Sequence, residues 1–297
     1  MTMNILVTGA NGQLGREIRN ASAGCGHRFI FTDVSQAPDL ETIYLDITNT
    51  DAVRIICRSE EVDVIVNCAA YTDVEKAESD LTFADLLNHT APANLATVAA
   101  ERGATLIHVS TDYVFDGEGN VPYRESDSPS PLGAYGMTKF AGERSVMNSG
   151  CKYMIFRTAW LYSPYGKNFV KTMVRLTGSN PSIKVVFDQI GSPTYAADLA
   201  GLIVRIISEG MLDRTGVYHF TDEGCISWYD LAVAVNRLCG HGCAVKPCHT
   251  GEFPTKARRP KYSVLDKSLV KDTFGITIPY WLDSLEACMS RINNETL

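Results

Sequence analysis

The feature that most restricts the fold is a glycine-rich turn close to the N-terminus. An apolar run at residues 4–8 leads into Gly9, Gly12 and Gly15, and a helical pattern covers residues 14–21. Glycine permits a tight turn and lets the backbone approach a ligand closely. A strand, a glycine turn and the free N–H groups of a following helix together make a phosphate-binding unit. The spacing Gly-x-x-Gly-x-x-Gly therefore predicts a strand–turn–helix unit that can hold a dinucleotide.

Strand-like and helical segments alternate through the first 160 residues. The apolar runs show little polar–apolar alternation, as expected for strands that are covered on both faces. The expected strands are 4–8, 29–33, 42–45, 62–70, 105–111 and 153–159, and the expected helices are 14–21, 52–58, 83–101 and 134–147. This order predicts an α/β protein with a doubly wound parallel sheet of the Rossmann type.

The pattern loosens after Trp160, where prolines interrupt the chain more often. The expected helices here are 168–177, 196–209, 228–239 and 280–292, and the expected strands are 183–187 and 217–220. We expect residues 1–160 to form a dinucleotide-binding domain, with segments near 195–220 returning to it. Residues 161–297 are expected to form mainly a smaller, mixed α/β substrate-binding domain.

Composition and the absence of long apolar runs argue against several classes of partner. The net charge of −7 and the pI near 5.4 disfavour nucleic acid as a partner, because phosphate binding favours a basic face. No apolar run approaches the roughly 20 residues of a membrane span, so no membrane partner is expected. The first residues lack the basic and apolar regions of a signal peptide, and a cytoplasmic protein is expected.

The nine cysteines are odd in number and scattered, which predicts free thiols. One group, Cys239, His241, Cys243, Cys248 and His249, has the residue types of a zinc site. Structural zinc usually uses two tight ligand pairs at regular spacing, and this group is irregular. We therefore expect no metal there.

Asp33 bears on the choice of dinucleotide. It ends the second expected strand, 18 residues beyond Gly15. A carboxylate in this position can accept hydrogen bonds from the adenosine ribose and would repel a 2′-phosphate. Asp33 therefore favours NADH over NADPH, without excluding either cofactor.

A second group of residues has the chemistry of a proton-transfer site. Tyr135 and Lys139 lie four residues apart on an expected helix and can share one face. Hydride addition to a carbonyl leaves an alkoxide that needs a proton, and a nearby ammonium would lower the pKa of a tyrosine toward neutrality. Thr111, or less favourably Ser110, can hydrogen-bond the substrate oxygen from the end of a strand. The combination predicts a nicotinamide-dependent enzyme that acts on a carbonyl or an alcohol.

The glycine turn and the Tyr-x-x-x-Lys pair resemble those of the extended short-chain dehydrogenase/reductase family. Within that family, the sequence resembles the dTDP-4-dehydrorhamnose reductase branch. The matching segments are 12–15, 67–72, 75–78, 110–117, 131–139, 156–162 and 188–194, with looser matches at Arg259-Pro260 and in the last helix. These segments cover the chain from its start to about residue 200.

The resemblance implies an NAD(P)H-dependent oxidoreductase of dTDP-rhamnose biosynthesis. Its reaction would reduce the C4 keto group of dTDP-4-dehydro-L-rhamnose to give dTDP-L-rhamnose. Tyr135 would protonate O4, Lys139 would hold the nicotinamide ribose, and Thr111 would orient the carbonyl. The implied substrate-binding residues are Thr111, Asp112, Trp160 and Arg259, the last as a partner of the diphosphate. The implied cofactor-binding residues are Gly9, Asn11, Gly12, Gln13, Leu14, Asp33, Asp46, Ile47, Ala70, Tyr71, Thr72, Val109, Tyr135 and Lys139.

Two departures from the family refine this expectation. Sugar-nucleotide dehydratases of the superfamily carry an acid immediately after Ser-Thr-Asp, where this chain has Tyr113, which favours simple reduction. Some members bind magnesium through several glutamates at a dimer contact. Glu17 matches one of these, but Ala197 stands in place of another, which argues against Mg²⁺. A homodimer is compatible with the resemblance.

Two alternatives remain open from the sequence. The chain could be a reductase or epimerase of another nucleotide sugar, because the pocket that sets the sugar stereochemistry has no sequence motif. It could also be a non-catalytic subunit, since the family includes a regulatory subunit of methionine adenosyltransferase. The intact set of Thr111, Tyr135 and Lys139 favours an enzyme.

Overall fold

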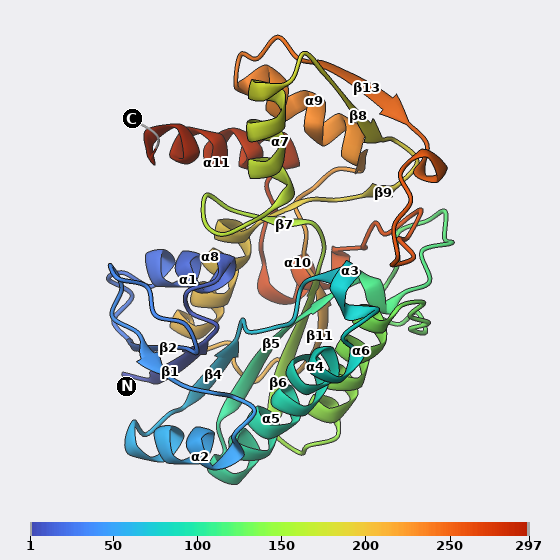
Figure 1. Ribbon diagram of the computed structural model, residues 1–297. Coiled ribbons are helices and arrows are strands. Elements are labelled where there is room, and N and C mark those ends of the chain that lie inside the picture. The colour runs from blue at the N-terminus through green and yellow to red at the C-terminus, as the bar shows by residue number, and fades with distance from the viewer. Residues whose placement is uncertain (1, 296–297) are drawn as a thin grey trace.

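Seven parallel strands form the central sheet of the computed structural model, which describes residues 2–295 (Figure 1). The last two residues of the expected second domain, 296–297, lie outside that range. The strand order is β11-β6-β5-β4-β1-β2-β3, and each neighbouring pair is parallel. The strands are β1 (Asn4–Thr8), β2 (Arg28–Asp33), β3 (Ile43–Tyr44), β4 (Val64–Asn67), β5 (Thr105–Thr111), β6 (Lys152–Thr158) and β11 (Gly216–His219). The predicted doubly wound parallel sheet is confirmed.

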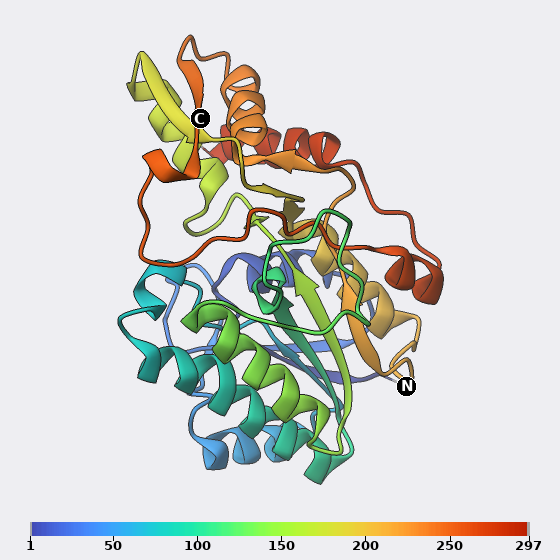
Figure 2. The ribbon, with the colours of Figure 1, turned by 90° about the vertical axis from the view of Figure 1, so that its right-hand side faces the viewer.

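Helices cover both faces of this sheet (Figures 1 and 2). Alternate residues of β1 face opposite sides, so Ile5 and Val7 pack in one core cluster and Leu6 in the other. The first cluster lies under α1 (Gln13–Ala21) and α8 (Ala196–Ser208), and the second under α2 (Thr50–Ser59), α5 (Ala91–Arg102) and α6 (Ala134–Met147). Burial on both faces explains why the strands read as continuous apolar runs.

The expected helix at 83–101 is interrupted by a π-helical turn. The structure has α4 (Leu81–Asp85), the π-helix η1 (Leu86–Thr90) and then α5. Pro92 has no N–H to donate to the preceding turn, which frees the carbonyl of Asn88. That carbonyl packs so closely on α6 that a Cβ at Gly142 would collide with it. The turn thus brings the buried Asn88 side chain against both backbone groups of Tyr71.

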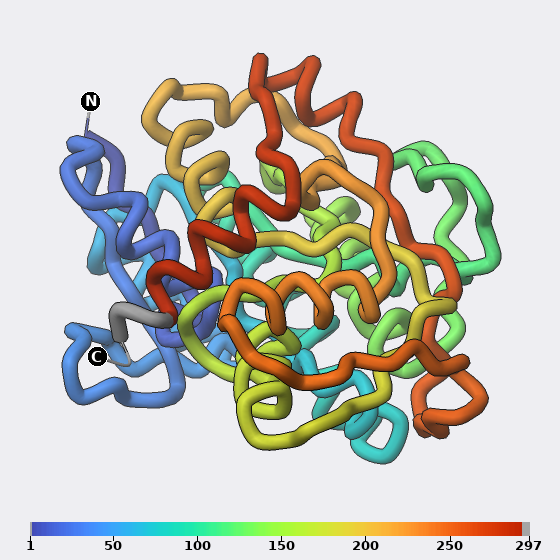
Figure 3. The backbone as a smooth tube through the Cα atoms, turned by 90° about the horizontal axis from the view of Figure 1, so that it is seen from above, coloured from blue at the N-terminus to red at the C-terminus, as the bar shows by residue number. Residues whose placement is uncertain are grey.

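A smaller group of elements lies beyond the carboxyl ends of the strands (Figures 1 and 3). It contains α7 (Phe169–Ser179), α9 (Trp228–Leu238), α11 (Trp281–Glu295) and the parallel pair β8 (Ser182–Val186) and β13 (Ala244–Cys248). Sequence patterns did not predict its short strands: β7 (Leu161–Tyr162), β9 (Ile190–Gly191), β10 (Thr194–Tyr195) and β12 (Ile226–Ser227). They also missed α10 (Ser268–Phe274), which packs with α8 and β11 in the first core cluster. Two-residue strands have no periodicity for a pattern to detect.

The lengths of the helices and the surroundings of the Cys/His group bear on the expectations about membranes and metals. Within residues 2–295, no helix has the length and apolar content to cross a membrane. Cys243 and Cys248 are buried, and His241 pairs its Nδ1 with the Thr177 hydroxyl at 2.9 Å. Over the same residues, no three His, Cys, Asp or Glu side chains gather as a metal-binding group.

Candidate active site

The residues expected to bind the cofactor follow the carboxyl ends of neighbouring strands. Gly9 follows β1, Asp33 ends β2, Asp46 lies just beyond β3, and Ala70 lies just beyond β4. Because these strands are parallel, their carboxyl ends share one edge of the sheet, where such folds bind their ligands. The fold therefore gathers residues that are far apart in sequence along one edge.

The glycine turn packs tightly and leaves helix donors unused. Gly9 has a φ of +64°, and a Cβ there would lie 2.6 Å from the Ala69 backbone nitrogen. A Cβ at Gly15 would lie 2.5 Å from the Ala10 Cα, so this glycine lets α1 approach the turn. Gly12 is the N-cap of α1 and supplies no side-chain cap. The first N–H groups of α1 are thus available to an anion, and the turn fits a dinucleotide pyrophosphate.

Asp33 organises the loop beside this turn. Its Oδ2 accepts the Asn11 N–H at 3.0 Å, and its Oδ1 accepts the Ser35 N–H at 2.8 Å and the Ser35 hydroxyl at 2.7 Å. The Asn11 side chain donates to the Ser35 carbonyl at 2.7 Å. The carboxylate therefore has a structural task in addition to its expected contact with ribose.

The remaining cofactor candidates are held by backbone contacts. Asp46 accepts the Thr48 N–H at 2.9 Å, and the adjoining Ile47 is buried. Tyr71 is buried with its N–H and carbonyl bound to Asn88 at 2.8 and 3.0 Å. Ala70 is half-buried and Thr72 is exposed. These contacts fix the two loops that would border an adenosine and a nicotinamide.

Lys139 is buried beneath the catalytic candidates. Its side chain is 2% exposed, and Nζ donates to the Val109 carbonyl at 2.7 Å. Burial lowers the pKa of Lys139 to about 8, against the opposing effect of Glu143. The ammonium is thus anchored to β5, next to the strand end where Thr111 lies.

The structure differs from the expected effect of Lys139 on Tyr135. Burial raises the pKa of Tyr135 to about 12, and only a hydrogen bond with Thr111 works in the opposite direction. The Lys139 ammonium is turned toward the Val109 carbonyl and does not offset the burial. The phenol therefore keeps its proton at neutral pH and is suited to donate it.

Thr111 lies between Tyr135 and Asp112. Its hydroxyl donates to Asp112 Oδ1 at 3.0 Å and is also within hydrogen-bonding reach of the Tyr135 phenol. Asp112 is 2% exposed, and burial raises its pKa to about 6. Tyr113 packs edge-on against Tyr135, with 5.4 Å between the ring centroids. The four side chains form a compact polar group at the end of β5.

Ser110, the weaker of the two hydroxyl candidates, belongs to a buried charge network instead. Its hydroxyl donates to the Glu143 carboxylate, which forms an ion pair with Arg157 at 2.7 Å. Glu143 is fully buried, and the Arg157 side chain is 4% exposed. Burial and the neighbouring Arg157 lower the pKa of His219 to about 3, so this histidine is neutral. Sequence reasoning missed this network, because no motif joins α6, β6 and β11.

Two of the expected substrate residues, Trp160 and Arg259, have contact partners outside this polar group. Trp160 has a φ of +50° and stacks on Trp228, with 3.7 Å between the ring centroids. Arg259 lies in a loop after η3 (Thr250–Glu252) and pairs with Glu75 at 3.1 Å. Burial raises the pKa of Tyr113, and the positive charge of Arg259 works against that shift; the Tyr113 ring in turn contacts Tyr135. Through Tyr113, Arg259 is therefore linked to the catalytic candidates.

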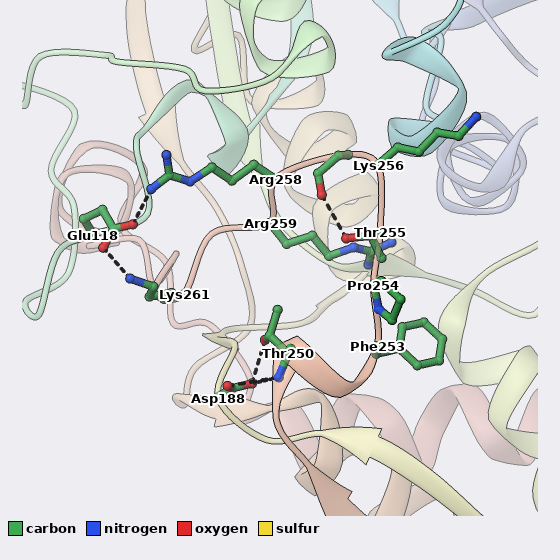
Figure 4. A pocket seen from close by; sticks show the side chains of 12 residues that line it. Glu118, Asp188, Thr250, Phe253, Pro254, Thr255, Lys256, Arg258, Arg259 and Lys261 are labelled. Carbon is green, nitrogen blue, oxygen red and sulfur yellow. Dashed lines mark hydrogen bonds and ion pairs between the residues drawn. The ribbon is translucent and has the colours of Figure 1, made fainter.

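Arg259 borders a cavity of about 500 Å³ with a basic wall (Figure 4). Arg258 and Lys261 both reach Glu118, at 2.9 Å each. Asp188 holds the other side by accepting the Thr250 N–H at 2.9 Å. The lining residues are Glu118, Asp188, Thr250, Gly251, Phe253, Pro254, Thr255, Lys256, Ala257, Arg258, Arg259 and Lys261. The lining holds four basic and two acidic residues, and this excess of positive charge is suited to an anionic group.

Comparison with known proteins identifies relatives over nearly the whole chain. A family model described as the RmlD substrate binding domain matches residues 3–294. The dTDP-4-dehydrorhamnose reductase of Aggregatibacter actinomycetemcomitans is 39% identical over 292 residues, which cover 95% of this chain and 97% of that protein. The dTDP-4-dehydrorhamnose reductase of Escherichia coli K12 is 39% identical over 303 residues, with 99% of each chain covered.

Two solved structures share the fold throughout. The structure of a dTDP-4-dehydrorhamnose reductase from Clostridium acetobutylicum has a TM-score of 0.91 and 44% identity, covering 98% of this chain and all of that one. The dTDP-4-dehydrorhamnose reductase from Bacillus anthracis, solved in complex with NADP, has a TM-score of 0.86 and 35% identity, with 98% and 100% covered.

Proposed function

Because the chain belongs to the RmlD substrate binding domain family, whose relatives named above are dTDP-4-dehydrorhamnose reductases, we propose that it reduces dTDP-4-dehydro-L-rhamnose to dTDP-L-rhamnose. The observation that carries this proposal is the half-buried phenol of Tyr135 beside the Thr111 hydroxyl, with a pKa that stays above the neutral range. A proton donor and a second hydroxyl at the carboxyl end of the sheet are what reduction of a ketone requires.

The chain's own residues supply the proton and hold the substrate. A bound reduced nicotinamide supplies the hydride. Tyr135 donates its phenolic proton to O4 of the sugar, and the Thr111 hydroxyl orients the same oxygen. Lys139 holds the nicotinamide ribose through its ammonium, which β5 anchors at the Val109 carbonyl. Asp112 and Trp160 contact the sugar, and Arg259 in the basic wall binds the diphosphate.

We also propose that the two parts of the chain bind different ligands. Residues 1–160, joined by segments near 195–220, bind the dinucleotide, and residues 161–297 mainly bind the nucleotide sugar. The pairing of β11 with β6 and the packing of α8 on α1 support the return of the second segment. The place of Arg259 in the basic wall supports the assignment of the C-terminal part.

A cofactor assay tests this proposal directly. Purified protein is mixed with NADH or NADPH and with dTDP-4-dehydro-L-rhamnose made in situ by the upstream enzymes. We expect oxidation of the cofactor that depends on the ketosugar. Oxidation only with a different nucleotide ketosugar would instead favour the alternative reductase.

We propose that the chain accepts either nicotinamide cofactor, with NADH slightly preferred. Asp33 supports this preference, because its carboxylate would repel a 2′-phosphate. In Asp33→Asn, we expect the ratio of kcat/KM for NADPH to that for NADH to rise about tenfold, equivalent to about 1.4 kcal/mol. The amide can keep the Asn11 contact through its oxygen. Steady-state kinetics with both cofactors measure the ratio, and an unchanged ratio would show that Asp33 does not select the cofactor.

As the pH rises above about 8, we expect kcat to fall and the contribution of Lys139 to the free energy of unfolding to rise. The pKa of Lys139 is lowered to about 8, so the ammonium proposed to hold the nicotinamide ribose loses its charge as the pH rises above that value. Tyr135 remains protonated there, and we expect kcat to fall above about pH 8. Between the lowered pKa and the normal value near 10.4, the unfolded chain binds a proton that the folded chain does not. The Lys139 contribution to stability therefore rises with pH in that window. A pH profile of kcat without an alkaline limb near 8 would contradict this role.

We propose that catalysis needs no divalent metal. Glu17, which matches a magnesium ligand of some relatives, pairs with Arg291 of α11 at 2.9 Å, and Figure 3 shows α11 reaching α1. A guanidinium thus already neutralises that carboxylate. We expect dialysis against EDTA to leave kcat and KM unchanged. Loss of activity that added Mg²⁺ restores would contradict the proposal.

A further inference from the structure

A short helix stands between the catalytic helix α6 and the basic wall of the cavity. α3 (Val74–Ala77) follows the loop after β4, and Asp73 caps it by accepting the Lys76 N–H at 3.0 Å. Ala77 is fully buried in a cluster with Tyr71, Ala84 and Ala134, against which Tyr135 packs. α3 is therefore a firmly packed support next to the catalytic tyrosine.

Glu78, immediately after α3, caps α6. Its Oε1 accepts the Ala134 N–H at 2.8 Å, and a Cβ on Gly133 would lie 2.7 Å from that oxygen. Gly133 is the N-cap residue of α6 and provides no side-chain cap of its own. A carboxylate suits a helix N-terminus, where it faces the positive end of the helix dipole. α3 thus fixes the start of the helix that carries Tyr135.

Glu75, one turn earlier, binds the wall of the cavity. Its Oε2 accepts the Lys256 N–H at 2.8 Å and the Ala257 N–H at 3.4 Å, and its Oε1 accepts a hydrogen bond from Arg259 Nη2 at 3.1 Å. Burial alone would raise the pKa of Glu75, but these hydrogen bonds hold it below its usual value. A single carboxylate therefore gathers three donors from a loop without regular secondary structure.

Arg259 keeps a donor for a ligand. Its Nε is buried and has no hydrogen-bond partner among the residues that the structure describes, although the side chain lines the cavity. A buried, unpaired N–H is unfavourable until an acceptor reaches it. Because the guanidinium is a planar fork, fixing Nη2 on Glu75 also fixes the direction of the other N–H groups.

We propose that Glu75 is a positioning residue for the nucleotide sugar: it holds Arg259 so that the free N–H groups of the guanidinium meet the substrate's diphosphate. This inference rests on the proposed function for the identity of that anion. Glu75 itself does not touch the substrate. The charge of Glu75 and its positioning of Arg259 have opposite effects on the binding of an anion. If Glu75 acted only through its charge, removing that charge would tighten the binding of an anion, whereas loss of positioning would weaken it.

Calorimetric titration with dTDP separates the two effects. We expect Glu75→Gln to weaken dTDP binding about tenfold, the loss of roughly one well-placed hydrogen bond. KM for the ketosugar should rise in parallel, while kcat and the affinity for NADH stay within about twofold. Unchanged NADH affinity also shows that the variant is folded, and Glu75→Asp, which keeps the charge but shortens the reach, should show the same loss. Glu101→Gln, which breaks an exposed, two-pronged pair with Arg54, is the matched control.

A double-mutant cycle decides whether Glu75 acts through Arg259. In Arg259→Ala, the further change Glu75→Gln should cost no additional dTDP affinity. Tighter or unchanged dTDP binding in Glu75→Gln, or an equal further loss in the Arg259→Ala background, would overturn the inference. A wild-type chain that binds dTDP and shows the expected cycle but does not reduce the ketosugar would overturn the proposed reaction alone. A wild-type chain that does not bind dTDP would overturn both.

Discussion

Replacing Tyr135 with phenylalanine is expected to lower kcat by about 10²–10⁴-fold, the usual contribution of a positioned general acid. The ring keeps its packing against Tyr113, and only the phenolic hydroxyl next to Thr111 is lost. Affinity for NADH should stay within about twofold, because an interaction made only in the transition state changes kcat and leaves ground-state binding intact. Single-turnover kinetics and a cofactor titration measure the two effects.

The matched control for this variant is Tyr153→Phe. Tyr153 lies on β6 and packs against the core cluster under α2 and α5, away from the carboxyl edge of the sheet. We expect its kcat to be unaffected. A Tyr135→Phe protein that kept wild-type kcat would rule out the phenol as the proton donor. Unchanged biological activity together with intact NADH binding would favour a regulatory subunit.

Glu143→Gln is expected to lower the free energy of unfolding by about 3–5 kcal/mol. The change removes the charge that pairs with Arg157 at 2.7 Å, with both side chains almost fully buried. His219, the nearest other partner of Arg157, is neutral and cannot replace the carboxylate. Urea denaturation at pH 7 measures the loss.

Two comparisons make this stability prediction specific. Glu101→Gln breaks an exposed ion pair with Arg54 and should change the free energy of unfolding far less, since water screens that pair. The double variant Glu143→Met with Arg157→Met should recover part of the loss, because it leaves no unpaired buried charge. A Glu143→Gln protein as stable as the wild type would show that the network does not hold α6 against β6.

The sheet and its helices could be predicted because each element has its signal, an apolar run or a helical pattern, within its own short segment of sequence. β1 reads as an apolar run that a glycine ends, and α6 reads as a helix with the observed limits, 134–147. The family resemblance rested on motifs at the carboxyl ends of the strands, and the relatives confirm it. A motif can be recognised in a sequence when one short segment contains all the residues that the chemistry needs, as in the turn from Gly9 to Gly15.

The contacts that organise the site could not be predicted in the same way. Glu75 meets Arg259, and Glu143 meets Arg157, only after distant segments pack together. The pKa of Tyr135 was expected to be lowered, whereas burial raises it. Helix spacing places Lys139 near Tyr135, but it does not reveal that the Val109 carbonyl binds the Lys139 ammonium. The π-helical turn has one signal in the sequence: Pro92, which lacks an N–H and lies inside the segment that otherwise reads as one continuous helix.

The most direct test of the reaction is the position of the transferred hydrogen. The protein is incubated with dTDP-4-dehydro-L-rhamnose, made in situ, and a reduced nicotinamide cofactor in which both hydrogens of the reactive carbon are deuterium, and the product is examined by NMR. We expect dTDP-L-rhamnose with deuterium at C4 of the sugar, formed about 10²–10⁴-fold more slowly with Tyr135→Phe. Deuterium at another sugar carbon, or no labelled sugar with the wild-type protein, would contradict the proposed reaction.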